Sequence, residues 1–438
     1  MTHLANILIA TDDLDLTRLL VERVHSFGYE GKAVTSQSAA LEIAGSAHPD
    51  IVLVGSSLQG GDAFSLVAAL KQIPSCVDIP VCLLAAERSV ELHRRALEAG
   101  LDDVVPPPLD DYKLAARLRP LVRLATMHAE LRHRAVSAKR FGIDVDPALP
   151  FVAIPSDYPL MIVGEDTNHL RAPLSEARIT VAPEPYTAED LLTSSNFDAA
   201  VLAPSGSIDP YLDLCAQVRN NPRLFNLPLV VVSDDETMSE ATAYGNGASA
   251  YFSNPPNPDE LKNSVLGLVR RQRTRWAIRQ ALSRTMSDAN RDKGTNLYSR
   301  AFFDAYLSDR VEQSTRQHRH LSLMFFRIPD IEGVRQRFGE TQANHLRLQC
   351  AQWITGLLRG EDMTARFDEN EFCVVLPDTP KNEAEIVMHR IAGVLAYTDF
   401  AVVDVYQPVK VWVRVGGADI QPGDSVESLV ARAREGIV

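Results

Sequence analysis

The sequence predicts an α/β protein with two doubly wound parallel sheets in tandem, followed by a C-terminal α+β domain. The length of 438 residues suits about three domains, since domains commonly hold roughly 100–200 residues each. Short apolar runs alternate with helical patterns in two successive segments, which is typical of parallel sheets. Closer to the C-terminus, a charged turn separates two strand-like runs, which indicates an antiparallel hairpin.

The composition is that of an ordinary globular protein, with 45% hydrophobic and 23% charged residues. The net charge of −13 at pH 7 argues against a general nucleic-acid or anionic-membrane binder. We find no apolar run of the ~18 residues that a membrane-spanning helix needs, and no signal-peptide pattern. We therefore expect a cytoplasmic protein without nucleic-acid binding or membrane insertion. The cysteines lack metal-site spacing and are predicted to be buried free thiols: Cys76, Cys82, Cys215, Cys350 and Cys373.

The first domain is predicted to span residues 1–125, and it resembles a response-regulator receiver domain of the flavodoxin-like fold over residues 5–122. Its expected strands are Asn6–Ala10, Asp50–Val54, Ile79–Leu84 and Asp103–Val105. In receivers the third strand ends in the Asp that accepts phosphate, but Gly55 stands there. Phosphoryl transfer to a protein needs a nucleophilic side chain. We therefore predict a pseudo-receiver, in which Asp12 and Asp13 are solvated loop carboxylates. The alternative is that this acidic pair holds a cation.

A second pseudo-receiver is predicted for residues 158–275, because the same pattern repeats. Its expected strands are Leu160–Val163, Phe197–Leu202, Leu227–Val232 and Ala250–Phe252. By the same alignment Ala203 or Pro204 occupies the phosphate-acceptor position, and Asn254 stands where receivers have Lys. The resemblance therefore implies that this domain is not phosphorylated either.

Two arginine-rich helical patterns follow these domains, one from Asp110 to Arg140 and one from Asp259 to Asn290. They lead into the predicted linkers, residues 126–157 and 276–291. We interpret both as solvated helices that connect domains, the first of which also supports dimerisation. The alternative is an electrostatic docking site for a partner, which for the first helix includes an acidic protein or a nucleic acid.

The hairpin in the last domain, residues 292–438, carries the most informative motif. It reads Asp-Glu-Asn-Glu-Phe over Asp368–Phe372, and its acidic tip is expected to project into solvent. The stretch resembles the GGDEF signature of diguanylate cyclases, Gly-Gly-(Asp/Glu)-Glu-Phe. Both glycines and the carboxylate at the third position are missing here.

The positions that hold metal and substrate in the GGDEF family are also changed. The resemblance places Arg327, Pro329 and Asn370 where the family has the Asp-x-Asp motif and the third hairpin residue. Mg²⁺ requires carboxylate oxygens, which neither a guanidinium nor an amide supplies. Arg335 and Asn344 replace the family's guanine-binding Asn and Asp. We therefore predict that the protein is not an enzyme and binds no metal.

An Arg-x-x-Asp motif at Arg359 and Asp362 lies just before the hairpin. In the GGDEF family this motif is the inhibitory site for cyclic di-GMP, and Arg390 matches a further family arginine on the next helix. A guanidinium can donate to guanine O6 and N7, while an Asp accepts from guanine N1 and N2. We therefore predict a cyclic di-GMP site at these three residues. The alternative is a surface salt bridge at a helix end.

The layout of two receiver-like domains and a GGDEF domain resembles the PleD-type family, and its PopA-like members in particular. The resemblance implies a homodimeric cyclic di-GMP effector or scaffold, recruited to the cell pole. Its implied partners are protein adaptors of a regulated protease and the protease's substrate, a cell-cycle regulator. The alternatives are a residual diguanylate cyclase or GTP-binding regulator, and a dimeric scaffold that is indifferent to nucleotide.

Overall fold

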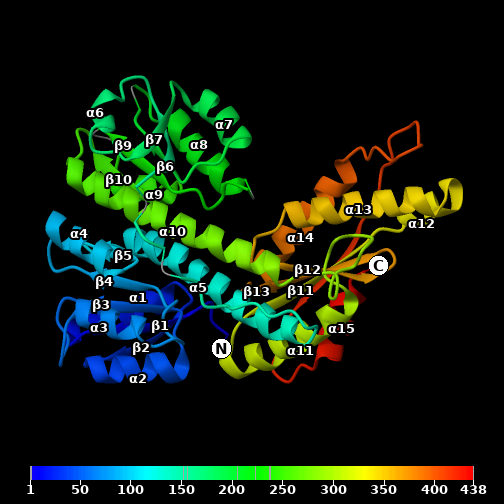
Figure 1. The fold of residues 1–438 in the computed structure, drawn as a ribbon, viewed down its shortest axis with the longest axis horizontal. Helices are drawn as coiled ribbons and strands as arrows, with labels where there is room; N and C mark the ends of the chain where they lie inside the picture. Colours follow the sequence, from blue (N-terminus) through cyan, green and yellow to red (C-terminus); the bar gives the residue numbers. More distant parts are fainter. Residues whose placement is uncertain are drawn as a thin grey trace. The chain divides into compact units, whose positions relative to one another are not determined.

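The computed structural model describes residues 2–150, 152–154, 156–204, 206–221, 223–235 and 238–437. The chain forms two compact units (Figure 1). The first contains Asn6–Ala125 and Ala148–Ala277, and the second contains Met1–Ala5, Thr126–Pro147 and Ile278–Val438. Two long helices, α5 (Asp111–Lys139) and α10 (Pro258–Arg284), each contribute residues to both units.

The first unit begins with a five-stranded sheet whose order is β2-β1-β3-β4-β5, with every neighbouring pair parallel. Its strands are β1 (Asn6–Ala10), β2 (Glu30–Val34), β3 (Ile51–Gly55), β4 (Val81–Leu84) and β5 (Asp103–Val105). The connecting helices are α1 (Leu14–Ser26), α2 (Gln37–Ala47), α3 (Ala63–Lys71) and α4 (Val90–Ala99). The Asp13 side chain caps α1 by accepting from the backbone N–H groups of Asp15 and Leu16.

A second sheet repeats this arrangement in the order β10-β9-β8-β6-β7, again with parallel neighbours. Its strands are β6 (Tyr158–Val163), β7 (Ala177–Ala182), β8 (Ala199–Leu202), β9 (Leu229–Ser233) and β10 (Ala250–Ser253). Its helices are α6 (Asn168–Arg171), α7 (Pro185–Ser194), α8 (Asp209–Asn220) and α9 (Glu240–Gly245). The predicted α/β class with doubly wound parallel sheets is confirmed.

The expected strand sets omitted β2 and β7, one from each parallel sheet. Both strands lie at the edge of their sheet. Most of the side chains of β2 and β7 are at least partly exposed, whereas β3 and β9 are wholly buried. These two edge strands therefore lack the continuous apolar run that marks a central parallel strand.

The C-terminal domain has an antiparallel sheet in the order β12-β13-β11-β14. Its strands are β11 (Leu321–Arg327), β12 (Met363–Asp368), β13 (Glu371–Pro377) and β14 (Arg414–Asp419). Its helices are α11 (Arg300–Gln317), α12 (Asp330–Phe338), α13 (Glu340–Gly356), α14 (Lys381–Tyr397) and α15 (Val426–Glu435).

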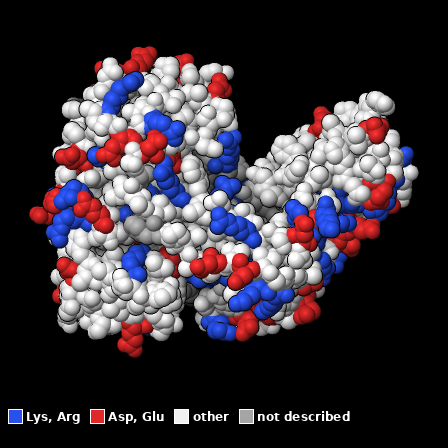
Figure 2. Space-filling model, viewed as in Figure 1, with Lys and Arg blue, Asp and Glu red and all other residues white. Residues whose placement is uncertain are grey.

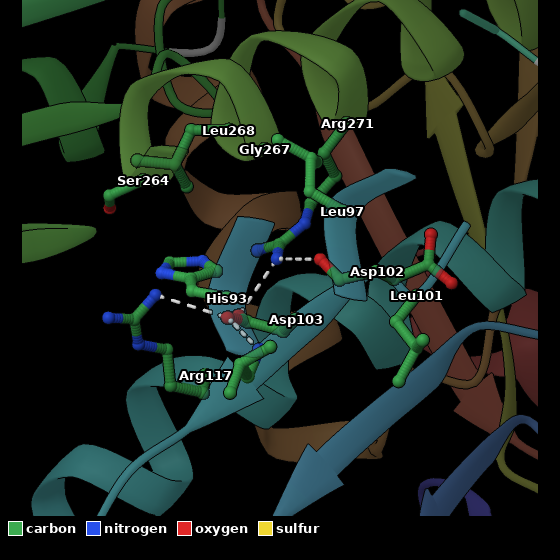
Figure 3. Close-up of a pocket in the computed structure, with 11 residues that line it drawn as sticks. His93, Leu97, Leu101, Asp102, Asp103, Arg117, Ser264, Gly267, Leu268 and Arg271 are labelled. Carbon is green, nitrogen blue, oxygen red and sulfur yellow. Dashed lines mark hydrogen bonds and ion pairs between the residues drawn. The ribbon is translucent and has the colours of Figure 1, made fainter. Parts of the chain in front are cut away.

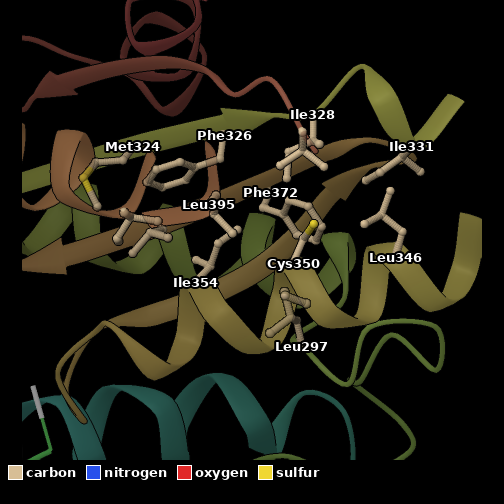
Figure 4. Close-up of a cluster of buried hydrophobic side chains, with 14 of the residues drawn as sticks. Leu297, Met324, Phe326, Ile328, Ile331, Leu346, Cys350, Ile354, Phe372 and Leu395 are labelled. Carbon is tan, nitrogen blue, oxygen red and sulfur yellow. The ribbon is translucent and has the colours of Figure 1, made fainter. Parts of the chain in front are cut away.

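Side chains alternate along each strand, so apolar residues point to both faces of this sheet. A buried hydrophobic cluster covers each face. Met324 and Phe326 of β11 belong to the cluster drawn in Figure 4, together with Cys350 of α13 and Leu395 of α14. Phe325 belongs to a second cluster on the opposite face. The turn before β12 and the β12–β13 hairpin are thereby held on a rigid scaffold. As predicted, the five cysteines are buried and free.

The interpretation of the two arginine-rich helices as solvated is wrong for many of their arginines. Arg134 of α5 and Arg270, Arg271 and Arg275 of α10 are all buried. Arg270 donates from Nη1 to the carbonyl of Leu97 at 2.7 Å. Burial of a guanidinium is tolerated where carbonyl or carboxylate oxygens receive its N–H groups. Those oxygens come from distant segments, so the helix sequence alone does not reveal them.

Charges of both signs are intermixed on the face of the molecule shown in Figure 2, where Lys and Arg lie among Asp and Glu. Within the described ranges, no helix has the length and apolar character needed to cross a bilayer.

The end of β3 has no room for a side chain. A Cβ atom on Gly55 would lie 2.7 Å from the Thr11 Cβ, and Thr11 is buried. The position that holds the phosphate-accepting Asp in receivers is therefore closed by packing as well as by sequence.

We expect Gly55→Ala to lower the free energy of unfolding by about 1–3 kcal/mol, the usual cost of overpacking. Urea unfolding followed by circular dichroism measures this change. Gly45 of α2 provides the matched control, since its Cβ would meet nothing within 4 Å. Gly45→Ala is expected to stabilise the protein by about 0.5–1 kcal/mol, the intrinsic helix preference of Ala over Gly. Equal stability of the two variants would contradict this account of Gly55.

Candidate functional site

The Arg-x-x-Asp motif forms a tight turn between the end of α13 and the start of β12. The backbone N–H of Arg359 donates to Oδ2 of Asp362 at 2.8 Å, and the backbone N–H of Asp362 donates to the carbonyl of Arg359 at 3.2 Å. Asp362 is only 8% exposed, whereas the Arg359 side chain lies at the surface. The turn thus fixes the position of the Asp362 carboxylate, while the Arg359 side chain lies at the surface of the domain.

Arg390 reaches the same place from α14. Its Nη2 donates to the carbonyl of Leu357 at 3.0 Å, directly after the last residue of α13. The carbonyl end of a helix carries partial negative charge, so a cation is favoured there. Since Leu357 lies two residues before Arg359, the structure brings the three predicted site residues together at the end of α13. They come from a turn and a separate helix.

Arginines from both long helices also contact this turn, and the sequence analysis did not assign them to it. Nη2 of Arg134, on α5, donates to the carbonyl of Glu361 at 2.5 Å. The side chain of Arg279, on α10, lies against Gly360, where a Cβ atom would be 3.1 Å from the Arg279 Cγ. Both arginines lie far from the motif in sequence, and no local pattern indicates such a contact.

Arg134 belongs to a buried hydrogen-bonded network. Its Nε donates to Oε1 of Glu130 at 2.7 Å, and the Tyr306 hydroxyl donates to the same oxygen at 2.7 Å. Burial opposes the charged guanidinium and is the largest single effect, but Glu130, Tyr298 and Tyr306 together outweigh it and raise the pKa of Arg134. The network holds α5 against α11 and anchors the backbone of the turn.

The hairpin tip departs from the expectation that all of its acidic side chains project into solvent. Asp368 and Glu369 are exposed, but Glu371 is only 4% exposed. Its two carboxylate oxygens accept from Nε and Nη2 of Arg434, on α15, at 2.8 and 3.0 Å. The expectation was wrong for Glu371 because a partner from the last helix supplies a two-point contact.

Ion pairs gather beside the hairpin around Arg335 of α12. Its guanidinium lies 2.7 Å from carboxylate oxygens of both Glu332 and Glu369 and 2.8 Å from Glu340. The hydrogen bond from Arg335 lowers the pKa of Glu369, and the same bond raises the pKa of Arg335. Arg347 of α13, whose side chain is only 2% exposed, donates from Nε to the Glu369 carbonyl at 2.8 Å. The cluster joins the hairpin to α12 and α13.

The positions that hold the metal ion in the GGDEF family carry no carboxylate in this chain. Arg327 ends β11 between Glu371 of β13 and Arg414 of β14. The backbone carbonyl of Asn370 accepts from Ile328 at 2.9 Å. Among the residues that the structure describes, no group of three or more His, Cys, Asp and Glu side chains is arranged to hold a metal ion.

Comparison with known proteins matches two segments of the chain to known families. Residues 289–437 match the family described as diguanylate cyclase, GGDEF domain, and residues 7–119 match the response regulator receiver domain. The response regulator PleD of Caulobacter vibrioides is 27% identical over 440 residues, which cover 99% of this chain and 96% of PleD. The transcriptional regulatory protein PrrA of Mycobacterium leprae is 28% identical over 139 residues, 32% of this chain and 59% of PrrA.

Among solved structures, the GGDEF domain of DgcB from Caulobacter crescentus in complex with c-di-GMP matches with a TM-score of 0.33 and 20% identity. The match covers 34% of this chain and 86% of the DgcB domain. The chain thus combines a receiver domain with a GGDEF domain, in an architecture similar to that of PleD.

Proposed function

We propose that the protein is a cyclic di-GMP-binding effector whose own GGDEF domain is catalytically inactive. The observation that carries this proposal is the convergence of Arg359, Asp362 and Arg390 at the end of α13, within a domain that matches the GGDEF family. The domain's hairpin, by contrast, is joined to neighbouring helices by Arg–Glu pairs.

The chemistry of the turn suits a guanine base. The exposed Arg359 guanidinium has a planar fork of donors that can pair with guanine O6 and N7. The Asp362 carboxylate accepts from the backbone N–H of Arg359 and has the chemistry of an acceptor for the guanine N1 and N2 hydrogens. Arg390 adds positive charge for a phosphate of the dinucleotide. Together these groups match both the base and the backbone of cyclic di-GMP.

Two features support the loss of cyclase activity. No carboxylate occupies Arg327, Pro329 or Asn370, so these residues do not fit the Mg²⁺ that phosphoryl transfer requires. Arg335, at the position of the family's guanine-binding Asn, is committed to Glu332, Glu340 and Glu369. A substrate guanine would have to displace those ion pairs.

We further propose that the ligand-bound protein acts as a scaffold in the manner implied by its PopA-like sequence. In this proposal a homodimer recruits protein adaptors of a regulated protease, and with them a cell-cycle regulator, at the cell pole. The full-length similarity to PleD supports the signalling context. The identity of the partners rests on the sequence resemblance alone.

Calorimetric titration of cyclic di-GMP into the full-length protein tests the proposal. We expect micromolar or tighter binding by the wild type. Arg359→Ala is expected to weaken binding about 10- to 100-fold, the effect of losing a charge-assisted hydrogen bond worth roughly 1.5–3 kcal/mol.

The matched control is Arg316→Ala. Arg316 is 72% exposed on α11 of the same domain and pairs only with Glu312 among the described residues, so this variant should bind like the wild type. A wild-type protein that does not bind cyclic di-GMP would contradict the proposal and favour the nucleotide-independent scaffold. Unchanged affinity in Arg359→Ala would place the ligand elsewhere.

A further inference from the structure

We propose that Arg279 of α10 is a fourth cationic contact for the ligand, and that binding thereby ties α10 to the Arg359–Asp362 turn. This inference rests on the proposed function, because it concerns the same ligand and the same turn. It adds a residue from a helix that enters the domain from the preceding unit.

The geometry of Gly360 is the first support. Its φ angle lies outside the left-handed region, so no backbone constraint calls for glycine. A Cβ atom there would lie 3.1 Å from Cγ, 3.4 Å from Cδ and 3.4 Å from Nε of Arg279. The Arg279 side chain therefore lies against the second position of the motif, and a larger residue there would push it aside.

The exposure and hydrogen bonding of the Arg279 guanidinium give the second support. Arg270, Arg271 and Arg275 on the same helix are buried and bonded to carbonyl or carboxylate oxygens. Arg279 is exposed, and across the described residues no carboxylate or carbonyl receives its N–H groups. Its donors remain available beside Arg359, the residue assigned to guanine.

The chemistry of the ligand fits a further guanidinium. Cyclic di-GMP carries two phosphate groups and two guanine bases, and an arginine can pair with a phosphate through two N–H groups or stack on a base. A ligand held at its guanine edge by Arg359 brings these groups next to the chain at Gly360. Arg279 already lies against that residue, so it needs no rearrangement of the backbone to reach them.

A ligand held in this way would connect the turn to both long helices. Arg134 of α5 already bonds the carbonyl of Glu361, and Arg279 of α10 would bond the ligand itself. The helices α5 and α10 each run from one compact unit into the other. Ligand binding would therefore restrain both of the helices that connect the units.

Titration of cyclic di-GMP into full-length Arg279→Ala and Arg284→Ala tests this inference. Both arginines are exposed near the C-terminal end of α10, but only Arg279 lies against Gly360. We expect Arg279→Ala to weaken binding about tenfold or more, as loss of a charge-assisted contact does, and Arg284→Ala to match the wild type. Gly360→Ala should also weaken binding, because its Cβ displaces the Arg279 side chain.

Arg359→Ala, measured in the same series, separates this inference from the proposed function. If Arg359→Ala loses binding while Arg279→Ala keeps wild-type affinity, the role of Arg279 is overturned and the proposed function stands. If the wild type does not bind, both are overturned. Thermal unfolding of each variant verifies that the fold is retained.

Discussion

Replacing Asp103 by Ala should lower the free energy of unfolding of the first compact unit by about 3–5 kcal/mol. Asp103 lies on β5 and its side chain is only 4% exposed. Nη2 of Arg271, on α10, lies 2.8 Å from Oδ2, and Nη1 of Arg117, on α5, lies 3.3 Å from Oδ1 (Figure 3). Removing the carboxylate leaves two guanidinium groups buried without their common counter-charge.

This effect also has a defined dependence on pH. Burial raises the pKa of Asp103, but the charges of Arg117 and Arg271 outweigh burial and hold the pKa below its ordinary value. A carboxyl group whose folded-state pKa is lowered stabilises the protein above its unfolded-state pKa, about 4. The contribution of Asp103 should therefore be complete at neutral pH and decline as the pH falls through the folded-state pKa.

Urea unfolding of Asp103→Ala at neutral pH measures the change. Arg94→Ala is the control, because Arg94 pairs with Glu91 and Glu98 on the surface of α4 with its own side chain 48% exposed. An exposed pair contributes only ~0–1 kcal/mol. If the two variants were equally stable, the buried cluster would contribute no more to stability than a surface ion pair. That result would contradict our conclusion that the buried arginines of α5 and α10 stabilise the fold through their ion pairs.

The second prediction concerns diguanylate cyclase activity, and it follows from the proposal that the GGDEF domain is catalytically inactive. With GTP and Mg²⁺, the purified protein is expected to form no cyclic di-GMP. Restoring one acidic residue with Asn370→Asp should not produce activity, because Arg327 remains at the metal position and Arg335 remains bonded to Glu369. Metal stabilisation of charge is worth several kcal/mol, so its loss alone slows the reaction about a thousandfold or more.

Chromatographic separation of the nucleotides after incubation provides the measurement, with a parallel sample in EDTA. Product that forms in the presence of Mg²⁺ and not in EDTA would contradict the proposal and support the residual cyclase. Arg335→Ala gives a further check. It should free Glu369 from its ion pair and still yield no product, since no carboxylate is gained at the metal position.

Much of the fold follows from local patterns. The strands β1, β3 and β4 were expected near their observed positions because a central parallel strand is a continuous apolar run. The edge strand β5 was expected as well, because its short run is buried and contains Val104 and Val105. The hairpin was expected from two strand-like runs on either side of Glu369 and Asn370. Strand β14 was not anticipated, because it contains Gly416 and Gly417 and only Val415 among its six residues is β-branched or aromatic.

Residue identity at the family positions can be read from the chain alone: no carboxylate stands at Gly55 or Asn370, and an Arg-x-x-Asp motif begins at Arg359. These are statements about residue identity at aligned positions, and local patterns suffice for them. The burial of Glu371, the pairing of Asp103 with two arginines and the contact of Arg279 with Gly360 became evident only from the folded chain. Burial and ion pairing depend on side chains from segments far apart in the chain, which meet only when the cores form.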